Sequence, residues 1–365
     1  MDLTPLANNL SVIIPHFGSY TLLRNCLDSL QFTSVENIIV VEDGCYDPTI
    51  QEDYPDVQFE RLKTNSGFAV ACNHGLERVQ TPFVAILNND VQVTPKWHLP
   101  ILEVLESHPD IAVCQPKIKS AQNPQLFDYA GGGGGFLDQY GYPFCRGRIF
   151  DVIENDRGQY DNPCDIFWAS GAAFVARTED VRRAGGFDPI FFAYMEEIDL
   201  CWRLQALGKR IVFVPESEVY HEGSASWASM PLRKAYLLHR NNLLLLLKNY
   251  SRRDLLAILW TRILLELGST AFFLVRGEVR RSAAILRALA WNLAHYRELK
   301  ERYHGRVGGP SYKLSRRQDL ACLYRSSIAL QHFLGGVNHF DELDWEIPTL
   351  ASSEGHQPDD DLASG

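Results

Sequence analysis

The chain has 365 residues, of which 46% are apolar and 22% are charged, a mixture typical of globular proteins. These values exclude a mainly disordered, collagen-like or disulfide-scaffold protein, and a chain of this length can bury a large core without metal or disulfide support. The formal net charge of −10 hides an uneven distribution: residues 230–310 hold fifteen Lys and Arg against five Asp and Glu, whereas residues 341–365 hold eight acidic and no basic residues.

The first third of the sequence alternates short apolar runs with helical patterns. The runs are rich in Val and Ile, as buried parallel strands are. Alternation at this spacing predicts a parallel sheet with helices on both faces. Strands are predicted at residues 10–15, 37–42, 57–62, 83–88 and 111–116, and helices at 19–31, 67–79 and 95–107.

The rest of the chain is predicted to hold hairpins, a few strands and long helices. A Gly- and Pro-rich stretch at 131–164 predicts hairpins that cover a site, and the pattern becomes wholly helical from about 231 to 303. Further elements are a helix near 178–184, short strands at 209–215 and 218–223, a terminal helix at 311–340, and an acidic, disordered tail at 341–365.

The eight cysteines form no C-x-x-C pair, which argues against a zinc ribbon or a thioredoxin-type motif. The first ten residues, MDLTPLANNL, lack the charged and apolar regions of a signal peptide. A cytoplasmic location with reduced thiols is therefore expected.

Polar residues follow three of the predicted strands, at 15–18, 42–44 and 88–90. In a sheet of this kind, ligands bind beyond the carboxyl ends of the strands, so these residues are candidates for a binding site. Asp90 follows Asn88 and Asn89, and a carboxylate among oxygen-bearing neighbours suits a hard divalent cation that is held jointly with phosphates. The alternative is a turn or a helix cap.

A cluster of carboxylates lies in the segment EEID, where a helix is expected. Helical spacing places Asp199 and Arg203 on one stripe, where they are predicted to form an ion pair. Glu197 lies on a different row with Cys201. A carboxylate on an apolar row beside a cleft has a raised pKa and can act as a general base. The alternative is that the whole cluster caps the start of the helix.

Other residues also have two interpretations. His221 follows a predicted strand and is either a metal ligand or a hydrogen-bonded edge residue. Trp168 and Gly171, in the segment FWASGA, could stack on a sugar ring and let a ligand approach the backbone, or they could pack in the core. Arg240 could clamp a diphosphate, or it could lie on a solvated helix face.

These motifs occur in the order found in one known family. The chain resembles the family-2 glycosyltransferases, which are inverting enzymes of the GT-A fold, and in particular bacterial rhamnosyltransferase-like members. The resemblance implies an α/β, GT-A type, Rossmann-like fold with a mostly parallel sheet flanked by helices and a C-terminal helical region. It covers roughly residues 10–250 and rests on the combined order of SVIIPHFG, IIVVEDGCYD, NSGFAVACNHGL, VAILNNDV, WASGAAFVAR, AGGFDPIFFAYMEEIDLCWRL and VYHEGSASW.

The resemblance also implies a division of the chain. A catalytic domain is expected at 1–230, with a nucleotide-sugar half at about 1–116 and an acceptor half at about 117–230. A basic amphipathic helical region follows at 231–310.

The family's functional residues can be placed on this sequence by their motifs. The resemblance implies that Glu197 is the catalytic base and that Asp90 and His221 contact a divalent cation, Mg²⁺ or Mn²⁺. It implies a nucleotide-binding set of Pro15, His16, Phe17, Glu42, Asp43, Asn65, Gly67, Asn73 and Asn89, and a diphosphate or acceptor set of Trp168, Gly171, Glu196 and Arg240.

The sequence departs from the family pattern at several of these positions. Glu42 stands where Asp is usual, Phe17 and Gly18 stand where Tyr-Asn is usual, and Glu197 stands where Asp is commonest. Asn88 replaces the first Asp of the family's D-x-D metal motif, as in many rhamnosyltransferase-like relatives. One protein carboxylate then remains at the metal, so the cation is expected to arrive with the nucleotide.

The resemblance implies an inverting transfer of a sugar, from a nucleotide-diphospho sugar to a saccharide or lipid-linked saccharide, in cell-surface polysaccharide synthesis. A sugar-nucleotide nucleotidyltransferase should carry a basic, Gly-rich loop after the first strand, where this chain has PHFGSY. A processive polysaccharide synthase should carry membrane spans and a Q-x-x-R-W motif, and neither is evident. An inactive nucleotide- or carbohydrate-binding module is the third alternative. Nucleic-acid binding is not expected, because the basic segment is strongly apolar.

Residues 255–275 form an apolar stretch of 21 residues, close to the length that spans a bilayer. Arg262 and Glu266 interrupt it and are spaced to pair with each other. Helices lying in the interface of the inner membrane, at its cytoplasmic face, are therefore favoured over a span. The alternative is that these helices pack on the catalytic domain or form the interface of a homo-oligomer. The donor sugar, the acceptor and the oligomeric state cannot be read from the sequence.

Overall fold

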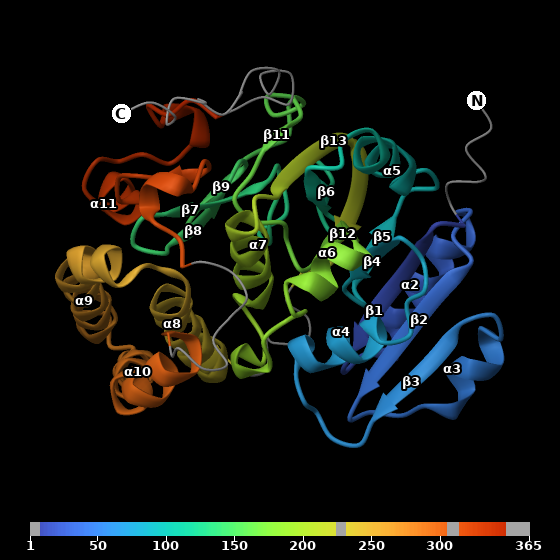
Figure 1. Ribbon diagram of the computed structural model, residues 1–365, viewed down its shortest axis with the longest axis horizontal. Helices are drawn as coiled ribbons and strands as arrows, with labels where there is room; N and C mark the ends of the chain where they lie inside the picture. Colours follow the sequence, from blue (N-terminus) through green and yellow to red (C-terminus); the bar gives the residue numbers. More distant parts are fainter. Residues whose placement is uncertain (1–7, 224–230, 305–313, 348–365) are drawn as a thin grey trace, which may run out of the picture.

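The fold, described for residues 8–223, 231–304 and 314–347 by a computed structural model, is built on a mixed β-sheet. The strands of this main sheet are β1 (Leu10–His16), β2 (Asn37–Asp43), β3 (Gln58–Leu62), β4 (Phe83–Leu87), β5 (Val91–Val93), β6 (Ile111–Ser120), β11 (Cys164–Asp165), β12 (Ala173–Arg177) and β13 (Arg210–His221). Their order is β11-β13-β6-β12-β4-β1-β2-β3, and β5 pairs with β13 (Figure 1).

The expected parallel sheet is confirmed for most of its strands. β1 pairs in parallel with β2 and β4, β2 with β3, and β6 with β13. One strand, β12, runs antiparallel between β4 and β6. The strands expected separately at 209–215 and 218–223 are one strand, β13, whose register shifts between Val214 and Glu218. Pro215 lies in this interval and has no N–H for the ladder, which explains why the sequence reads as two strands.

Helices cover both faces of the main sheet, as predicted. Alternation along β1 points Leu10, Val12 and Ile14 into one core and Ile13 into the other. The first core contains side chains of α2 (Tyr20–Gln31), α3 (Pro48–Asp53) and α5 (His98–Ser107), and the second contains side chains of α4 (Phe68–Leu76), α6 (Thr178–Arg183) and α7 (Glu196–Ala206).

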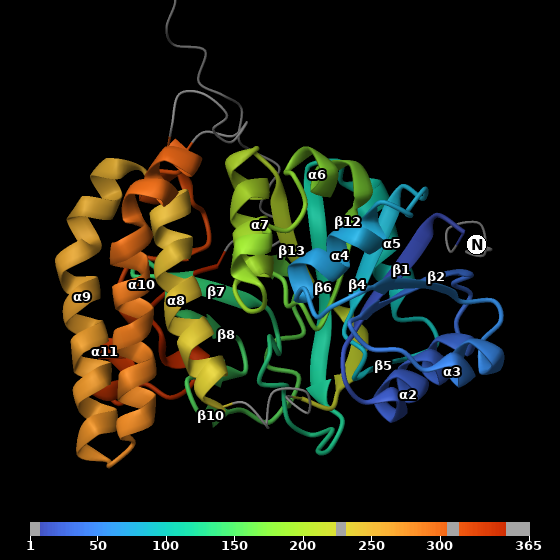
Figure 2. The same cartoon turned by 90° about the horizontal axis from the view of Figure 1, so that it is seen from below.

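A second sheet lies beside the first, where the 131–164 stretch forms the predicted hairpins (Figure 2). Its strand order is β10-β9-β8-β7-β14, and we call it the accessory sheet. The strands are β7 (Gly135–Asp138), β8 (Pro143–Cys145), β9 (Arg148–Ile149), β10 (Val152–Ile153) and β14 (Leu323–Tyr324).

The prediction of one terminal helix at 311–340 is wrong for the part that the structure describes. From residue 314 the chain forms β14, a short helix α11 (Ile328–Phe333) and two 3-10 turns. The beginning of the expected disordered tail is packed: the ring centroids of Phe136 and Trp345 lie 5.1 Å apart, and Ile347 also packs on the core. These aromatic contacts outweigh the acidic composition of the segment. Residues 348–365 lie outside the described part of the chain.

The helical region predicted from 231 to 303 is confirmed as three helices, α8 (Pro231–Asn249), α9 (Arg252–Val275) and α10 (Val279–His304). Figures 1 and 2 show them side by side at one end of the molecule, with α8 next to α7. The predicted pair of Arg262 and Glu266 is present and buried. By length and composition, α9 could cross a membrane, and only 17% of its most apolar window is buried.

Candidate active site

A cavity of about 540 Å³ opens where β1, β2 and β4 end and α7 begins. This volume lies within the usual range for pockets that bind small molecules. Thirteen of the sixteen residues predicted from the sequence line it, although they come from seven separate stretches of the chain. They are Pro15, His16, Phe17, Asp43, Asn65, Gly67, Asn89, Asp90, Trp168, Gly171, Glu196, Glu197 and His221.

Glu42 is the first of three predicted residues that do not line the cavity. Its buried carboxylate accepts hydrogen bonds from the Tyr20 hydroxyl at 2.7 Å and from Nε of Arg61 at 2.8 Å. Tyr20 in turn packs on the ring of His16, with the centroids 4.4 Å apart. Glu42 therefore lies behind the cavity and holds Tyr20 against His16, which lines it.

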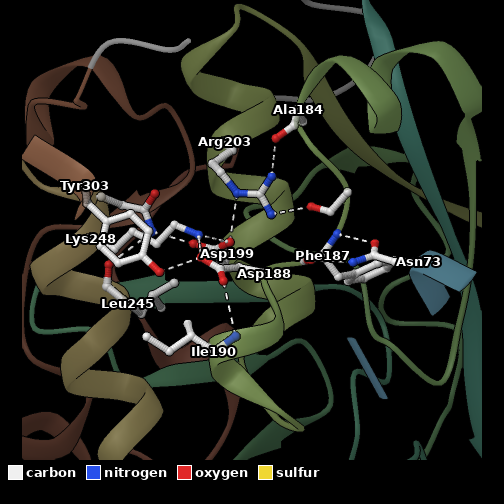
Figure 3. A network of polar contacts seen from close by, with 12 residues as sticks. Asn73, Ala184, Phe187, Asp188, Ile190, Asp199, Arg203, Leu245, Lys248 and Tyr303 are labelled. Atoms are coloured by element: carbon white, nitrogen blue, oxygen red, sulfur yellow. Dashed lines mark hydrogen bonds and ion pairs between the residues drawn. The ribbon is translucent and has the colours of Figure 1, made fainter. Parts of the chain in front are cut away.

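Asn73 and Arg240 are the other two, and both are hydrogen-bonded to backbone elsewhere. The Asn73 amide donates to the carbonyl of Phe187 at 2.7 Å and accepts from its N–H at 2.9 Å, as Figure 3 shows. Arg240 donates to the carbonyl of Phe191 at 2.9 Å and stacks on Trp291. This structure therefore gives no support to Arg240 as a diphosphate clamp. A buried Arg in a helix can serve packing as well as binding.

Asp43 shapes the wall of the cavity that follows β2. Its two carboxylate oxygens accept hydrogen bonds from the N–H groups of Ser66 and Gly67, at 2.6 and 2.8 Å. Burial raises the pKa of Asp43, and these two hydrogen bonds oppose the shift. Gly67 has φ 93°, and a Cβ there would lie 2.5 Å from the carbonyl oxygen of Phe192. Only glycine allows this turn to approach the loop before α7 so closely.

His16 and Asn89 join the ends of β1 and β4. Nδ2 of Asn89 lies 2.7 Å from Nδ1 of His16, and both side chains are buried. Burial lowers the pKa of His16 to about 4. His16 is therefore neutral near pH 7 and adds no positive charge to this wall of the cavity.

His221 lies between two carboxylates at the far side of the strand ends. Its Nε2 lies 3.1 Å from Oδ1 of Asp90, and its Nδ1 lies 2.9 Å from Oδ1 of Asp128. Burial lowers its pKa, but the two carboxylates outweigh burial and raise the pKa to about 10. Both ring nitrogens face a carboxylate, so His221 would have to leave one of them to bind a metal. The arrangement suits a residue that positions Asp90.

Asp90 itself fits a divalent cation. Its Oδ1 lies at ion-pair distance from His221 but accepts no hydrogen bond from the described residues, although it is buried. The His221 ring already faces this oxygen, so a divalent cation would compete with His221 for it. Among the described residues, no group of three or more His, Cys, Asp or Glu could hold a metal by itself. The donor set therefore suits an ion that shares its ligands with a bound phosphate.

Glu196 and Glu197 begin α7 and face the cavity. Burial raises the pKa of Glu197 to about 7, against the opposing effect of nearby backbone hydrogen bonds. Burial, followed by the charge of Glu197, raises the pKa of Glu196 well above its usual range. One oxygen of each carboxylate has no hydrogen-bond partner among the described residues. A carboxylate with this pKa can accept a proton near neutral pH.

The chain enters α7 through a strained loop, residues 191–195. Phe192, Tyr194 and Met195 have φ values of 67°, 71° and 72°, which are rare for residues with a Cβ. Each such residue costs on the order of 1–3 kcal/mol unless its surroundings hold it, and such strain is typical of functional sites.

Asn241 of α8 holds this loop from the outside. Its side-chain nitrogen lies within 2.7–2.9 Å of the carbonyl oxygens of Phe191, Ala193 and Tyr194. The helical region is thus directly connected to the loop that aims Glu197 into the cavity.

A buried network fixes α7 behind the cavity (Figure 3). The predicted pair of Asp199 and Arg203 is confirmed, at 2.8 Å. Asp199 also accepts hydrogen bonds from Lys248 at 2.8 Å and Asn249 at 2.9 Å, both from α8. Lys248 also forms an ion pair with Asp188 at 2.8 Å. Burial would raise the pKa of Asp188, but Lys248 lowers this pKa to about 2. This network is the second connection between α8 and α7.

Sequence reasoning missed several residues of this region. Asp128 is separated from its partner His221 by 93 positions, so no local pattern reveals the contact. Asn241 follows Arg240 in the sequence, and its three contacts with the loop 191–195 lie 47 to 50 positions away. Arg148 and Lys234 line the cavity and come from β9 and α8. Neither belongs to a recognisable motif.

Three comparisons show which known proteins this chain is similar to. Residues 11–163 match the family model described as Glycosyl transferase family 2. The chain is 29% identical over 245 residues to a Mycobacterium tuberculosis protein named pre-mycofactocin glycosyltransferase, which covers 64% of this chain and 46% of that protein. It is 24% identical over 269 residues to N-acetylglucosaminyl-diphospho-decaprenol L-rhamnosyltransferase of the same organism, which covers 67% of this chain and 85% of that protein.

The chain thus spans about half the length of the first of these relatives. Among solved structures, that of GalNAc-T7 with UDP, GalNAc and Mn²⁺ matches with a TM-score of 0.52 at 16% sequence identity. The match covers 67% of this chain and 48% of that one. At this identity the likeness concerns the fold, and the expected GT-A architecture is confirmed.

Proposed function

Since this chain carries a family-2 glycosyltransferase domain of the GT-A fold, we propose that it transfers a sugar from a nucleotide-diphospho sugar to a hydroxyl of a saccharide or lipid-linked saccharide, with inversion at the anomeric carbon. One observation carries the proposal: Glu197, a carboxylate with a pKa of about 7, faces the same cavity as Asp90. A base and an anchor for the leaving diphosphate are the two groups that such a transfer needs.

The donor nucleotide would lie against the walls at the ends of β1 and β2, between Pro15, Asp43 and Asn65. Its diphosphate would lie near Asp90, which would hold a divalent cation together with the phosphate oxygens. When bound, the cation neutralises charge on the diphosphate and makes it a better leaving group. The neighbour solved with Mn²⁺ makes Mn²⁺ the first ion to test.

Glu197 would act as the general base of the transfer. It accepts the proton of an acceptor hydroxyl, and the oxygen attacks the anomeric carbon from the side opposite the diphosphate. The new carbon–oxygen bond forms as the bond to the diphosphate breaks, and the electron pair leaves on the diphosphate oxygen. His221 would position Asp90, and Glu196 would lie on the acceptor side.

The acceptor would reach the cavity from the side formed by the described part of the acceptor half, residues 117–230, and by the helical region. A relative is named as a rhamnosyltransferase that acts on a diphospho-decaprenol saccharide, which makes rhamnose the first donor sugar to test and a lipid-linked saccharide the first acceptor. Such an acceptor would place the enzyme at the cytoplasmic face of the inner membrane, in the synthesis of a cell-surface polysaccharide.

Asp90→Ala is expected to remove metal-dependent nucleotide binding. Calorimetric titration with UDP, dTDP and GDP, each with and without Mn²⁺, should show one nucleotide that binds the wild type more tightly with the ion. The variant should lose at least about tenfold in this affinity, the smallest effect usual for groups that support a metal. Asp151→Ala removes an exposed carboxylate that does not line the cavity and serves as the control. Wild-type binding by the Asp90 variant in Mn²⁺ would contradict the proposed donor site.

Trp260→Glu is expected to weaken binding to anionic vesicles. Trp260 is 77% exposed and continues an apolar stripe on α9 with Leu256, Leu264 and Leu267. Exposed arginines at both ends of this helix could contact anionic lipid. Burying a large apolar side chain contributes roughly 1.5–3 kcal/mol, so the membrane partition coefficient measured by flotation over a range of lipid concentrations should fall about tenfold or more.

Phe32→Glu is the matched control for this assay. Phe32 is 76% exposed and follows α2, at the opposite side of the molecule from α9 in Figure 1. Equal flotation of both variants, or no flotation of the wild type, would contradict membrane binding through α9. Such a result would indicate that α9 and α10 contact protein instead.

A further inference from the structure

Two cations lie near the ring of Tyr129, which lines the cavity. Cζ of Arg148 lies 4.5 Å from the centroid of this ring, and Nζ of Lys234 lies 5.8 Å from it. Arg148 belongs to the accessory sheet and Lys234 to α8. Among the described residues that line the cavity, Arg148 is the only Arg and Lys234 is the only Lys.

No described carboxylate lies within 4 Å of either cation, whereas Lys117, Lys248 and Arg262 each have a carboxylate within 3.1 Å. Arg148 is 7% exposed, and its buried Nε has no hydrogen-bond partner in the described ranges. Its two terminal nitrogens donate to the Phe150 carbonyl at 3.3 Å and to Sγ of Cys145 at 3.6 Å.

Nearby acidic groups do not neutralise this pair. Asp128 precedes Tyr129 and acts on Arg148 from a distance, but its Oδ1 already faces Nδ1 of His221 at 2.9 Å. Glu196 and Glu197 line the same cavity, and burial holds the pKa of both carboxyls high. Two cations held close to one ring without an ion-pair partner leave room for an anion with two charges.

We propose that Arg148 and Lys234 form a binding subsite for a phosphate or diphosphate group carried by the acceptor. This inference rests on the proposed transferase function and adds the residues that would hold a phosphate group of the second substrate. The pair belongs to β9 and α8, whereas the walls assigned to the donor are the ends of β1, β2 and β4. His221 connects Asp90, after β4, to Asp128, which precedes Tyr129.

Titration with inorganic pyrophosphate in EDTA tests the subsite without nucleotide, metal or turnover. The wild type should bind pyrophosphate, and Lys234→Gln and Arg148→Gln should each weaken binding about tenfold or more, as for a lost charge-assisted hydrogen bond. Arg148→Lys should retain part of the affinity. Arg253→Gln, at an exposed residue near the start of α9, should bind as the wild type does. Since Arg148 is buried, Lys234→Gln keeps the test valid if the Arg148 variant does not fold.

A second titration identifies the source of the phosphate. If the acceptor supplies it, Lys234→Gln binds the preferred nucleoside diphosphate with Mn²⁺ as tightly as the wild type does, and the KM for a phosphate-bearing acceptor rises about tenfold while that for a phosphate-free glycan is unchanged. If nucleoside diphosphate binding weakens instead while binding of the free nucleoside does not, the pair belongs to the donor diphosphate and the acceptor assignment is wrong.

Two results would overturn the subsite itself. One is wild-type protein that does not bind pyrophosphate at millimolar concentration, and the other is equal affinity in the wild type and Lys234→Gln. Both are independent of the proposed transferase function, whose own failure would appear as absent binding of all three nucleotides with Mn²⁺.

Discussion

Glu197→Gln is expected to lower the rate of sugar transfer by about 10²–10⁴-fold, the usual contribution of a positioned general base. Gln has nearly the same shape as Glu but cannot accept the proton of the acceptor hydroxyl. Nucleotide binding should be unchanged, because Asp43, Asn65 and Asp90 remain in place. Single-turnover transfer assays measure the rate, and calorimetry measures the binding.

The pH dependence gives this prediction a second readout. Burial raises the pKa of Glu197 to about 7, so the fraction in the proton-accepting, ionised form grows as pH increases through 7. The wild-type rate should therefore rise about tenfold per pH unit below this value and level off above it. The residual activity of Glu197→Gln should lack this rise.

Glu179→Gln is the control, because Glu179 also begins a helix, α6, but is exposed and does not line the cavity. Turnover of Glu197→Gln close to that of the wild type would remove Glu197 from the role of base. Loss of nucleotide binding in the same variant would instead indicate a structural role.

Asp199→Asn is expected to lower the free energy of unfolding by about 3 kcal/mol, near the lower end for breaking a buried ion pair. The variant keeps the size of the side chain but removes the charge that faces Arg203 and Lys248, whose side chains are both 4% exposed. Lys248 retains its contact with Asp188, which limits the loss. Urea unfolding followed by fluorescence measures the change.

Asp53→Asn provides a comparison, because it breaks an ion pair with Arg24 in which both side chains are at least one-third exposed. Solvent screens such a pair, so this variant should unfold at nearly the same urea concentration as the wild type. An Asp199 variant as stable as the Asp53 variant would show that the buried network does not hold α7 to α8.

Contacts between residues close in sequence could be predicted, and the structure confirms them. Asp199 with Arg203, and Arg262 with Glu266, are each four residues apart on a helix, and helix geometry alone places such side chains together. The strand ends were also predicted, because alternating strands and helices place them at one edge of a sheet. Six of the residues that line the cavity were predicted for this reason, namely Pro15, His16, Phe17, Asp43, Asn89 and Asp90.

Contacts between distant segments could not be predicted in the same way. Asn73 bonds to Phe187, 114 positions away, and Asn241 reaches the loop before α7 from 47 to 50 positions away. A buried polar side chain needs a hydrogen-bond partner, but the sequence does not show which group will lie near it. Arg240 illustrates this, since its sequence context allowed a ligand contact and its side chain donates to the backbone carbonyl of Phe191.

The sequence by itself determined the order of the elements, the strand ends that form the cavity and the motifs of the family, because these depend on local periodicity and spacing. Only the tertiary structure decided that β12 is antiparallel, that the segment after residue 314 adds a strand to the accessory sheet, and that Arg148 and Lys234 share the ring of Tyr129. The physical reason is that strand direction and long-range contacts follow from how separate apolar faces pack together, which no short stretch of the chain records.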